Sequence, residues 1–108
     1  QIRQLLINLL QNALAATEGT GRRADVLLLA RREGERVDLE VHDNGRGIPP
    51  ADRARIFDAF FSTRKGGTGL GLAIAQRIAR AHGGDVVLHN RPQGGLDAVL
   101  KLPRRASQ

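Results

Sequence analysis

Hydrophobic and polar positions follow two different periods along this chain, and each period predicts one kind of secondary structure. Apolar residues recur every three or four positions over residues 1–17 and again over 70–82, which predicts two amphipathic helices. Shorter segments that alternate apolar with polar residues, or that are rich in Val and Leu, predict β-strands. These expected strands are 26–32, 36–43, 86–89 and 96–102, and a short helical turn is expected over 52–57.

The order of these elements predicts the fold class. A helix and two strands are followed by a loop, a second helix and two more strands, so that each pair of strands can form a hairpin. Hairpins favour an α+β fold, a two-layer sandwich with helices packed on one face of a mixed, mainly antiparallel sheet. They argue against a doubly wound parallel sheet. The 108 residues correspond to one domain that is long enough to bury a core of its own.

The strand over 36–43 carries the clearest alternation. Val37, Leu39 and Val41 are expected to face the core, and the polar residues on the other face are expected to face water, namely Asp38, Glu40 and His42. Asp43 shares the parity of the apolar residues. The pattern therefore directs a carboxylate toward the apolar side at the point where the strand ends.

Composition excludes several classes of function. The chain has no Cys, which excludes disulfides, thiolate zinc sites and cysteine nucleophiles. No apolar run approaches the roughly 20 residues that span a bilayer, and the helix-like start does not resemble a signal peptide. Three Phe without Trp or Tyr disfavour a nucleic-acid module that stacks bases. The net charge of +6 comes mostly from scattered arginines, and it favours an anionic ligand or an acidic partner only in general terms.

The glycine-rich segment 66–71 opens the second predicted helix. Glycines at a helix start allow the backbone N–H groups to approach an anion closely. The segment is neither a Walker A loop, which needs Gly-Lys-Ser/Thr, nor a Rossmann fingerprint, which follows a strand. Considered alone, it indicates either a phosphate site or a flexible turn before the helix.

Two further patterns carry candidate chemistry. In the segment 43–48, Gly45 and Gly47 alternate with larger residues, which lets the backbone pass close to a flat ligand, while Asp43 could accept a hydrogen bond from an exocyclic amine. The alternative is an Asx-type turn in which Asp43 caps its own backbone. Asn8 and Asn12 lie one helical turn apart, and their amide oxygens suit Mg²⁺, although a solvated polar stripe is the simpler alternative.

Taken together, these motifs resemble those of a known family. The segment 8–13 resembles the N box of sensor histidine kinases, 43–48 the G1 box, 56–61 the F box and 67–73 the G2 box, in the family's order. The chain is therefore similar to the catalytic ATP-binding domain of a two-component histidine kinase, on the Bergerat fold shared with gyrase, mismatch-repair and chaperone ATPases. The run from Phe60 to Arg64, with its short lid, resembles the nitrogen-regulation type.

The resemblance implies ATP and Mg²⁺ as cofactors and assigns roles to individual residues. Asn12 would be the principal Mg²⁺ ligand, with Asn8 at the polyphosphate side. Asp43 would bind the adenine amine, and the ATP-binding residues beside it in the G1 box would be Gly45, Gly47 and Ile48. Phe60 and Phe61 would anchor the lid, and Arg64 and Lys65 could reach the phosphates. The phosphates would lie at the start of the second helix, against Gly67, Thr68, Gly69, Leu70, Gly71 and Leu72.

The resemblance also implies partners and a division of labour. The domain would donate the γ-phosphoryl group of ATP to a histidine on a separate dimerisation domain, and it would reach a response regulator through the full-length protein. No catalytic residue is expected within these residues, since the three histidines lie outside any phosphoacceptor context. No contact with nucleic acid or membrane is expected from this domain, and a cytoplasmic location follows whether or not the parent protein is membrane-anchored. Relative to the family pattern, we expect an N-terminally truncated domain, since the sequence begins at the N box, after the family's phosphoacceptor helices and the strand that usually precedes the first helix.

Two alternatives within the same fold stay open, namely an ATP-hydrolysing enzyme and a non-catalytic nucleotide sensor. Hydrolytic relatives place a Glu at the position of Asn8, as a base for water, and an amide cannot take that proton. The sequence therefore favours transfer over hydrolysis. Ala15, where many members carry a charged residue, and the unusual Gly95-Leu96-Asp97 in the last strand are the departures from the family pattern.

Overall fold

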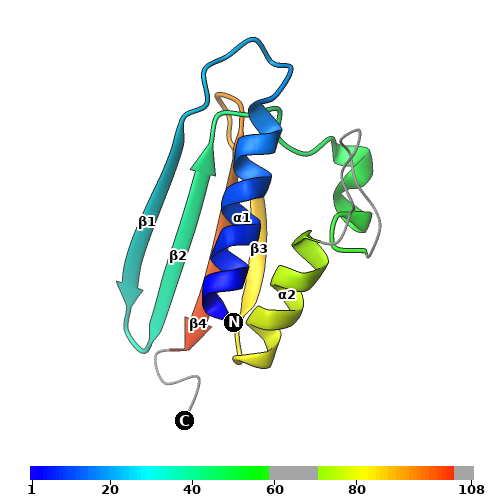
Figure 1. Ribbon diagram of the computed structural model, residues 1–108. Helices are drawn as coiled ribbons and strands as arrows, with labels where there is room; N and C mark the ends of the chain where they lie inside the picture. The colour runs from blue at the N-terminus through cyan, green and yellow to red at the C-terminus, as the bar shows by residue number, and fades with distance from the viewer. Residues whose placement is uncertain (59–70, 104–108) are drawn as a thin grey trace.

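The computed structural model describes residues 1–58 and 71–103. Two α-helices, one 3₁₀ helix and four strands make up this part of the chain, and Figure 1 shows their arrangement. In chain order they are α1 (Ile2–Thr17), β1 (Val26–Glu33), β2 (Arg36–Asp43), η1 (Pro50–Arg55), α2 (Gly71–Ala81), β3 (Asp85–Asn90) and β4 (Leu96–Pro103).

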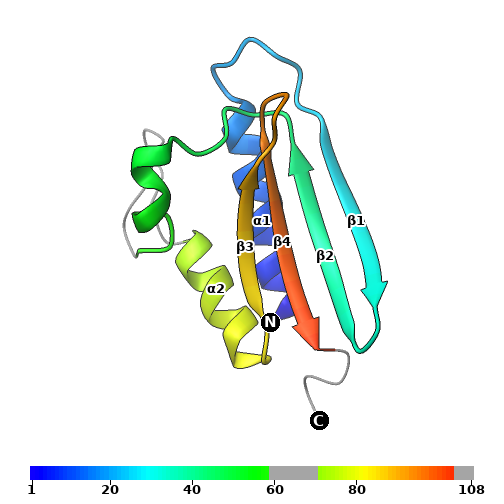
Figure 2. The same cartoon turned by 180° about the vertical axis from the view of Figure 1, so that it is seen from behind.

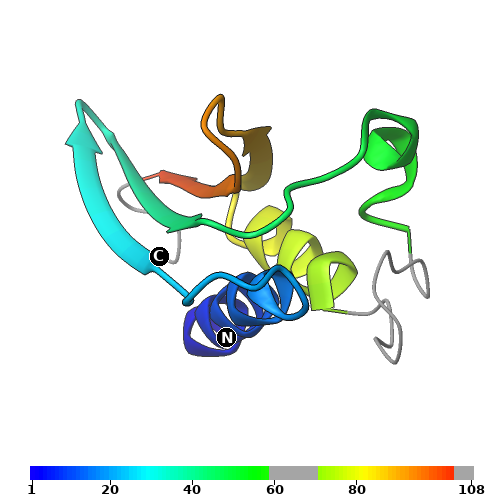
Figure 3. The same cartoon turned by 90° about the horizontal axis from the view of Figure 1, so that it is seen from above.

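The strands form one sheet in the order β1-β2-β4-β3, and every pairing among the described strands is antiparallel. Both α-helices lie on the same face of this sheet, as the view from above shows (Figure 3), and no helix of the described residues lies over the opposite face (Figure 2). The predicted α+β two-layer sandwich is therefore confirmed. No parallel pairing occurs among the described strands, so the sheet in this part of the chain is antiparallel rather than mixed.

The core lies between the helix layer and the sheet. Helix α1 buries one stripe of residues at the expected spacing, and α2 contributes two alanines that let it approach the sheet closely. Strand β4 lies between β2 and β3, and four of its residues are buried. The buried apolar residues of these elements include Leu5, Leu9, Ala13, Val41, Ala75, Ala79, Val86, Leu88, Leu96, Ala98, Val99 and Leu100.

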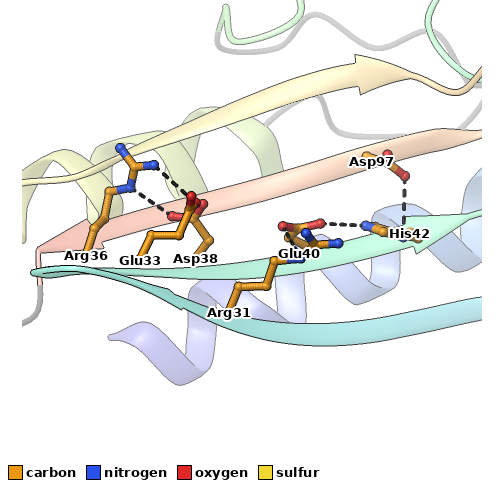
Figure 4. Close-up of polar contacts among 7 residues, drawn as sticks. All are labelled: Arg31, Glu33, Arg36, Asp38, Glu40, His42 and Asp97. Atoms are coloured by element: carbon orange, nitrogen blue, oxygen red, sulfur yellow. Dashed lines mark hydrogen bonds and ion pairs between the residues drawn. The ribbon is translucent and has the colours of Figure 1, made fainter.

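The outer face of β2 differs from the expectation that its polar residues face water. Asp38 is only 5% exposed, and the side chains of Glu40 and His42 are 13% and 14% exposed. Within β2 itself, Arg36 Nε lies 3.2 Å from Asp38 Oδ1, and from the neighbouring β1, Arg31 Nε lies 3.2 Å from Glu40 Oε2. His42 Nε2 lies 2.8 Å from Glu40 Oε1, and its Nδ1 lies 3.7 Å from Asp97 Oδ1 (Figure 4). The outer face is thus a paired polar layer, because β2 is an inner strand with a neighbour on each side.

Several element ends differ from the predicted ones by one or two residues. The short helix η1 begins at Pro50, two residues before the expected start, since proline has the right backbone angle for a first helical position. Helix α2 ends at Ala81, and the following Gly83 has a positive φ of 82°. The N–H of Gly84 donates to the carbonyl of Ala79, which satisfies an end carbonyl of the helix as a glycine C-cap does.

Candidate functional site

Asp43 is the last residue of β2, and it is 2% exposed. The parity prediction that this carboxylate lies on the buried side is therefore confirmed. Its Oδ1 accepts a hydrogen bond of 2.8 Å from the backbone N–H of Gly45, two residues further on. The Asx-type contact and the buried carboxylate thus occur together, and the two interpretations from the sequence do not exclude each other.

Burial raises the pKa of the Asp43 carboxyl above its usual range, because desolvation penalises the charged form. Hydrogen bonds from the N–H groups of Gly45 and Leu96 and the positive charge of Arg91 act in the opposite direction, while the charge of Asp97 adds to the rise. The net direction is upward. A carboxylate whose charge is poorly solvated is a strong acceptor for a further donor, such as the amine of a ligand.

The segment after Asp43 packs against the end of α1. The N–H of Arg46 donates to the carbonyl of Ala16 over 3.2 Å, and a Cβ on Gly45 would lie 2.6 Å from both the Cβ and the carbonyl oxygen of Ala16. No side chain fits at position 45 unless the loop or the helix moves. This contact explains the first glycine of the motif by close packing against the protein itself.

The other end of the segment is held by β3. Gly47 has a φ of 72°, and a Cβ there would lie 2.7 Å from Asn90 Oδ1. The same Asn90 amide accepts from the N–H of Ile48 and donates to its carbonyl, each over 2.8 Å. Ile48 itself is half-buried against the core.

Asn44 joins this segment to the connection between α1 and β1. Its Oδ1 accepts from the N–H of Asp25 over 2.9 Å, and its Nδ2 donates to the carbonyl of Arg23 over 2.9 Å. The guanidinium of Arg22 donates to the Asn44 carbonyl over 2.7 Å. Helix α1, strand β3 and the connection between α1 and β1 therefore together fix the position of residues 44–48.

The two predicted amide ligands lie on α1. Both Asn8 and Asn12 are half-buried, and Asn8 Nδ2 donates to the carbonyl of Gly71, the first residue of α2, over 3.4 Å. Asn8 Oδ1 accepts from Gln4 over 3.0 Å. Leu72 packs against the core cluster. The N-box helix and the start of the G2-box helix are thus brought together, as the resemblance implies.

The remaining predicted site residues lie outside the described part of the chain. These are Phe60, Phe61, Arg64, Lys65, Gly67, Thr68, Gly69 and Leu70, together with the short lid that the resemblance implies. Conversely, sequence reasoning missed three residues that shape the described site: Ala16, Asn90 and Gly95. Gly95 has a φ of 102°, and a Cβ at this position would overlap the Asp43 carbonyl oxygen. The glycine pair 94–95 was a visible signal of a turn, but its contact with Asp43 depends on the strand order.

A family model described as "Histidine kinase-, DNA gyrase B-, and HSP90-like ATPase" matches residues 1–106. The chain belongs to this family. Among its curated relatives, the sensor protein KdpD of Escherichia coli is 41% identical over 96% of this chain, and the sensor protein TorS of the same organism is 42% identical over 99%. The nitrogen regulation protein NtrY of Azorhizobium caulinodans is 39% identical over 86%. The chain spans only 12% to 13% of the length of these three proteins.

Solved structures show which members of this ATPase family the chain resembles in fold. The catalytic domain of the histidine kinase ThkA, in a nucleotide-free form, superposes with a TM-score of 0.82 at 36% identity, over 95% of this chain and 66% of that one. The full-length kinase ShkA in complex with AMPPNP gives 0.81 at 40% identity, over 94% of this chain and 21% of that one. The chain therefore has the fold of a histidine kinase catalytic domain. In the described residues, no helix has both the length and the apolar character needed to cross a membrane.

The donor groups of this ATPase-family member fit a magnesium nucleotide. No cluster of three or more His, Cys, Asp or Glu suited to a metal occurs in residues 1–58 and 71–103. The amides of Asn8 and Asn12 are neutral oxygen donors, which suit a Mg²⁺ ion that takes most of its ligands from phosphates and water. The Asp43 carboxylate has lone pairs beyond those used by backbone N–H groups, so it can accept from a further amine.

Proposed function

We propose that this chain binds Mg²⁺·ATP and donates the γ-phosphoryl group to a histidine on a separate dimerisation domain. The observation that carries the proposal is the buried carboxylate of Asp43 at the end of β2, flanked by the Gly45–Ile48 segment and backed by the N-box helix. Membership in the family of histidine kinase-like ATPases supports the nucleotide. The likeness to histidine kinase catalytic domains supports the histidine acceptor.

Asp43 selects the base in this proposal. Adenine presents an exocyclic amine, which can donate to a carboxylate, whereas guanine presents a carbonyl oxygen at the equivalent position. A carbonyl oxygen facing a poorly solvated carboxylate places two acceptors together without a proton between them, and such a contact is unfavourable. The site should therefore prefer ATP to GTP.

Asn12 would hold the Mg²⁺ ion through its amide oxygen, and Asn8 would lie beside the phosphates. When bound, the ion neutralises part of the triphosphate charge. The start of α2 lies close by, because Gly71 accepts from Asn8, and the positive end of a helix dipole favours an anion. Phosphoryl transfer needs positioning and charge neutralisation more than covalent chemistry from the protein, and these residues supply both.

Transfer is favoured over hydrolysis by the residue at position 8. An amide at this position cannot remove a proton from water, so the described site contains no base for a hydrolytic water at the place where hydrolytic relatives keep one. The acceptor histidine, the response regulator and a cytoplasmic location of this domain belong to the same proposal, since the relatives it matches are much longer sensor proteins.

Two measurements test the proposal. Calorimetry with Mg²⁺·ATP should give a dissociation constant between micromolar and millimolar, about −4 to −8 kcal/mol, and a clearly weaker one with GTP. Mixing the chain with the histidine-bearing domain of its parent kinase and labelled ATP should label that domain, with little phosphate release. Rapid release of phosphate by the chain alone would favour the hydrolase. Equal affinity for ATP and GTP would refute the role of Asp43, and binding without transfer would favour the nucleotide sensor.

A further inference from the structure

Asn90, the last residue of β3, makes an unusual contact for an exposed side chain. Its amide bonds both the N–H and the carbonyl of one residue, Ile48, which is 42 positions away in sequence. An Asn side chain carries the same donor and acceptor pair as a peptide group. The amide therefore continues the hydrogen bonding of β3 onto residues 43–48, the G1 segment, as a further strand residue would.

The surrounding contacts make this arrangement specific. The amide orientation is fixed, because a flipped side chain would place a donor against the N–H of Ile48 and an acceptor against its carbonyl. Gly47 lies so close to Asn90 that any side chain at 47 would displace the amide. In the hairpin that follows Asn90, the N–H of Arg91 donates to the carbonyl of Gly95 over 3.0 Å. Gly95 also lies against Gly47 and Asp43.

The three anchors of the G1 segment hold different parts of it. Asp43 holds the N–H of Gly45, and α1 holds the N–H of Arg46 through Ala16. The anchor at Ile48 among the described residues is Asn90. Without that amide, no hydrogen bond in the described residues would hold the Gly47–Ile48 end, and only the packing of Ile48 against the core would remain. This end could then shift relative to the other two anchors, because glycine permits many backbone conformations.

We infer that Asn90 is a positioning residue for the nucleotide site, which fixes Gly47 and Ile48 against β3 and so sets the shape of the base pocket. This inference rests on the proposed function, since it names what holds the pocket in place. Asn90 acts through the loop backbone, and its effect is expected on nucleotide affinity more than on the turnover of bound nucleotide.

The test compares three variants of the chain. Asn90→Asp keeps the size and the acceptor but replaces the donor with a second oxygen facing the Ile48 carbonyl. Asn90→Ser keeps one group that can donate or accept. His89→Ala is the control, since His89 is the exposed neighbour on the same strand and has no hydrogen bond to the loop in the described contacts. Affinity for Mg²⁺·ATP and hydrogen exchange at the Ile48 amide are measured for each, with urea unfolding to compare stability.

Asn90→Asp should weaken binding of Mg²⁺·ATP by about tenfold, the order expected when one hydrogen bond is lost and an oxygen faces the Ile48 carbonyl in its place. It should also speed exchange at the Ile48 amide, while Asn90→Ser shows a smaller effect on both and His89→Ala shows none. If Asn90→Asp does not fold, the Asn90→Ser variant decides by the same two readouts. Unchanged affinity in folded Asn90 variants, with a wild type that binds ATP, would overturn the positioning role alone. A wild type that binds no ATP would overturn the proposed function, and the positioning role with it.

Discussion

Gly45 lies directly against Ala16 at the end of α1, so closely that a Cβ at position 45 would stand 2.6 Å from the Ala16 Cβ. The contact joins the G1 segment to the helix that carries the two candidate amide ligands. A change at either residue should therefore affect the proposed nucleotide site.

Gly45→Ala should displace the G1 segment and weaken ATP binding, because the added methyl group overlaps the helix end. We expect a loss of about 1–3 kcal/mol in the free energy of unfolding, typical of an overpacked site. Gly21→Ala is the control: it adds the same methyl group at a positive φ of 75°, but with no atom within 4 Å. It should cost about 1–2 kcal/mol in stability and leave ATP affinity unchanged. Calorimetry and urea unfolding on both variants test the prediction, and equal ATP affinities would contradict it.

Asp43→Asn should reduce ATP affinity without destabilising the fold. The variant keeps an oxygen for the Gly45 N–H and avoids burying a charge, but it weakens the acceptor offered to adenine. We expect roughly 2 kcal/mol of lost binding free energy, near the range for a hydrogen bond to a charged group. Asp38→Asn is a matched control, a buried Asp on the same strand that pairs with Arg36 on the outer face. It should lower stability by up to about 1 kcal/mol and leave binding intact. Similar ATP binding by wild type and Asp43→Asn would contradict the assigned role.

The raised pKa of Asp43 predicts a definite dependence of stability on pH. The folded state holds the proton more tightly than the unfolded state, whose pKa is near 3.8. The contribution of this group is therefore fully present below pH 3.8 and is lost as the pH rises through the folded pKa. Urea unfolding of wild type and Asp43→Asn is measured from below pH 3.8 upward. The free energy of unfolding of the variant, relative to that of the wild type, should rise with pH and become constant above the folded pKa. If Asp43→Asn instead lost stability relative to wild type as the pH rises, or if the difference did not depend on pH, the pKa would not be raised.

Asn12→Ala should remove the dependence of ATP affinity on Mg²⁺ while leaving the helix intact, because alanine is a better helix former than asparagine. Titrations with ATP in the presence and absence of Mg²⁺ measure this effect. Gln11→Ala, an exposed neighbour on the same helix, is the control and should keep the full dependence on Mg²⁺. A strong Mg²⁺ dependence retained in Asn12→Ala would exclude Asn12 as a metal ligand.

Asn8→Glu should raise phosphate release from ATP above the low value of the wild type, because it places a proton acceptor one turn before Asn12. The variant also loses the donor to the Gly71 carbonyl, so ATP affinity is expected to fall somewhat. Release of inorganic phosphate at saturating ATP separates the two effects. No increase in release from a variant that still binds ATP would show that position 8 does not decide between transfer and hydrolysis.

The periodic patterns were sufficient to predict the elements, and the parity of β2 was sufficient to predict that Asp43 is buried. The environment of Asp38 could not be predicted in this way. Its burial depends on β1 and β4 lying on either side of β2, and strand order is a long-range property that alternation does not encode. The contact of Asn90 with Ile48 depends on the same order. Local patterns therefore predict which face a residue occupies, while its neighbours on that face come from the topology.

The sheet order has a consequence for how the chain acquires its structure during synthesis. Strand β4 is the last of the four described strands in chain order, yet it lies between β2 and β3 and pairs with both. Until Leu96–Pro103 has emerged from the ribosome, the edge of β2 that faces β4 has no partner, and the sheet lacks a central strand with four buried residues. The β1–β2 hairpin can form early, but the domain as a whole is expected to fold only after translation of β4. During that interval the unpaired edge of β2 is the segment most open to a chaperone or to aggregation.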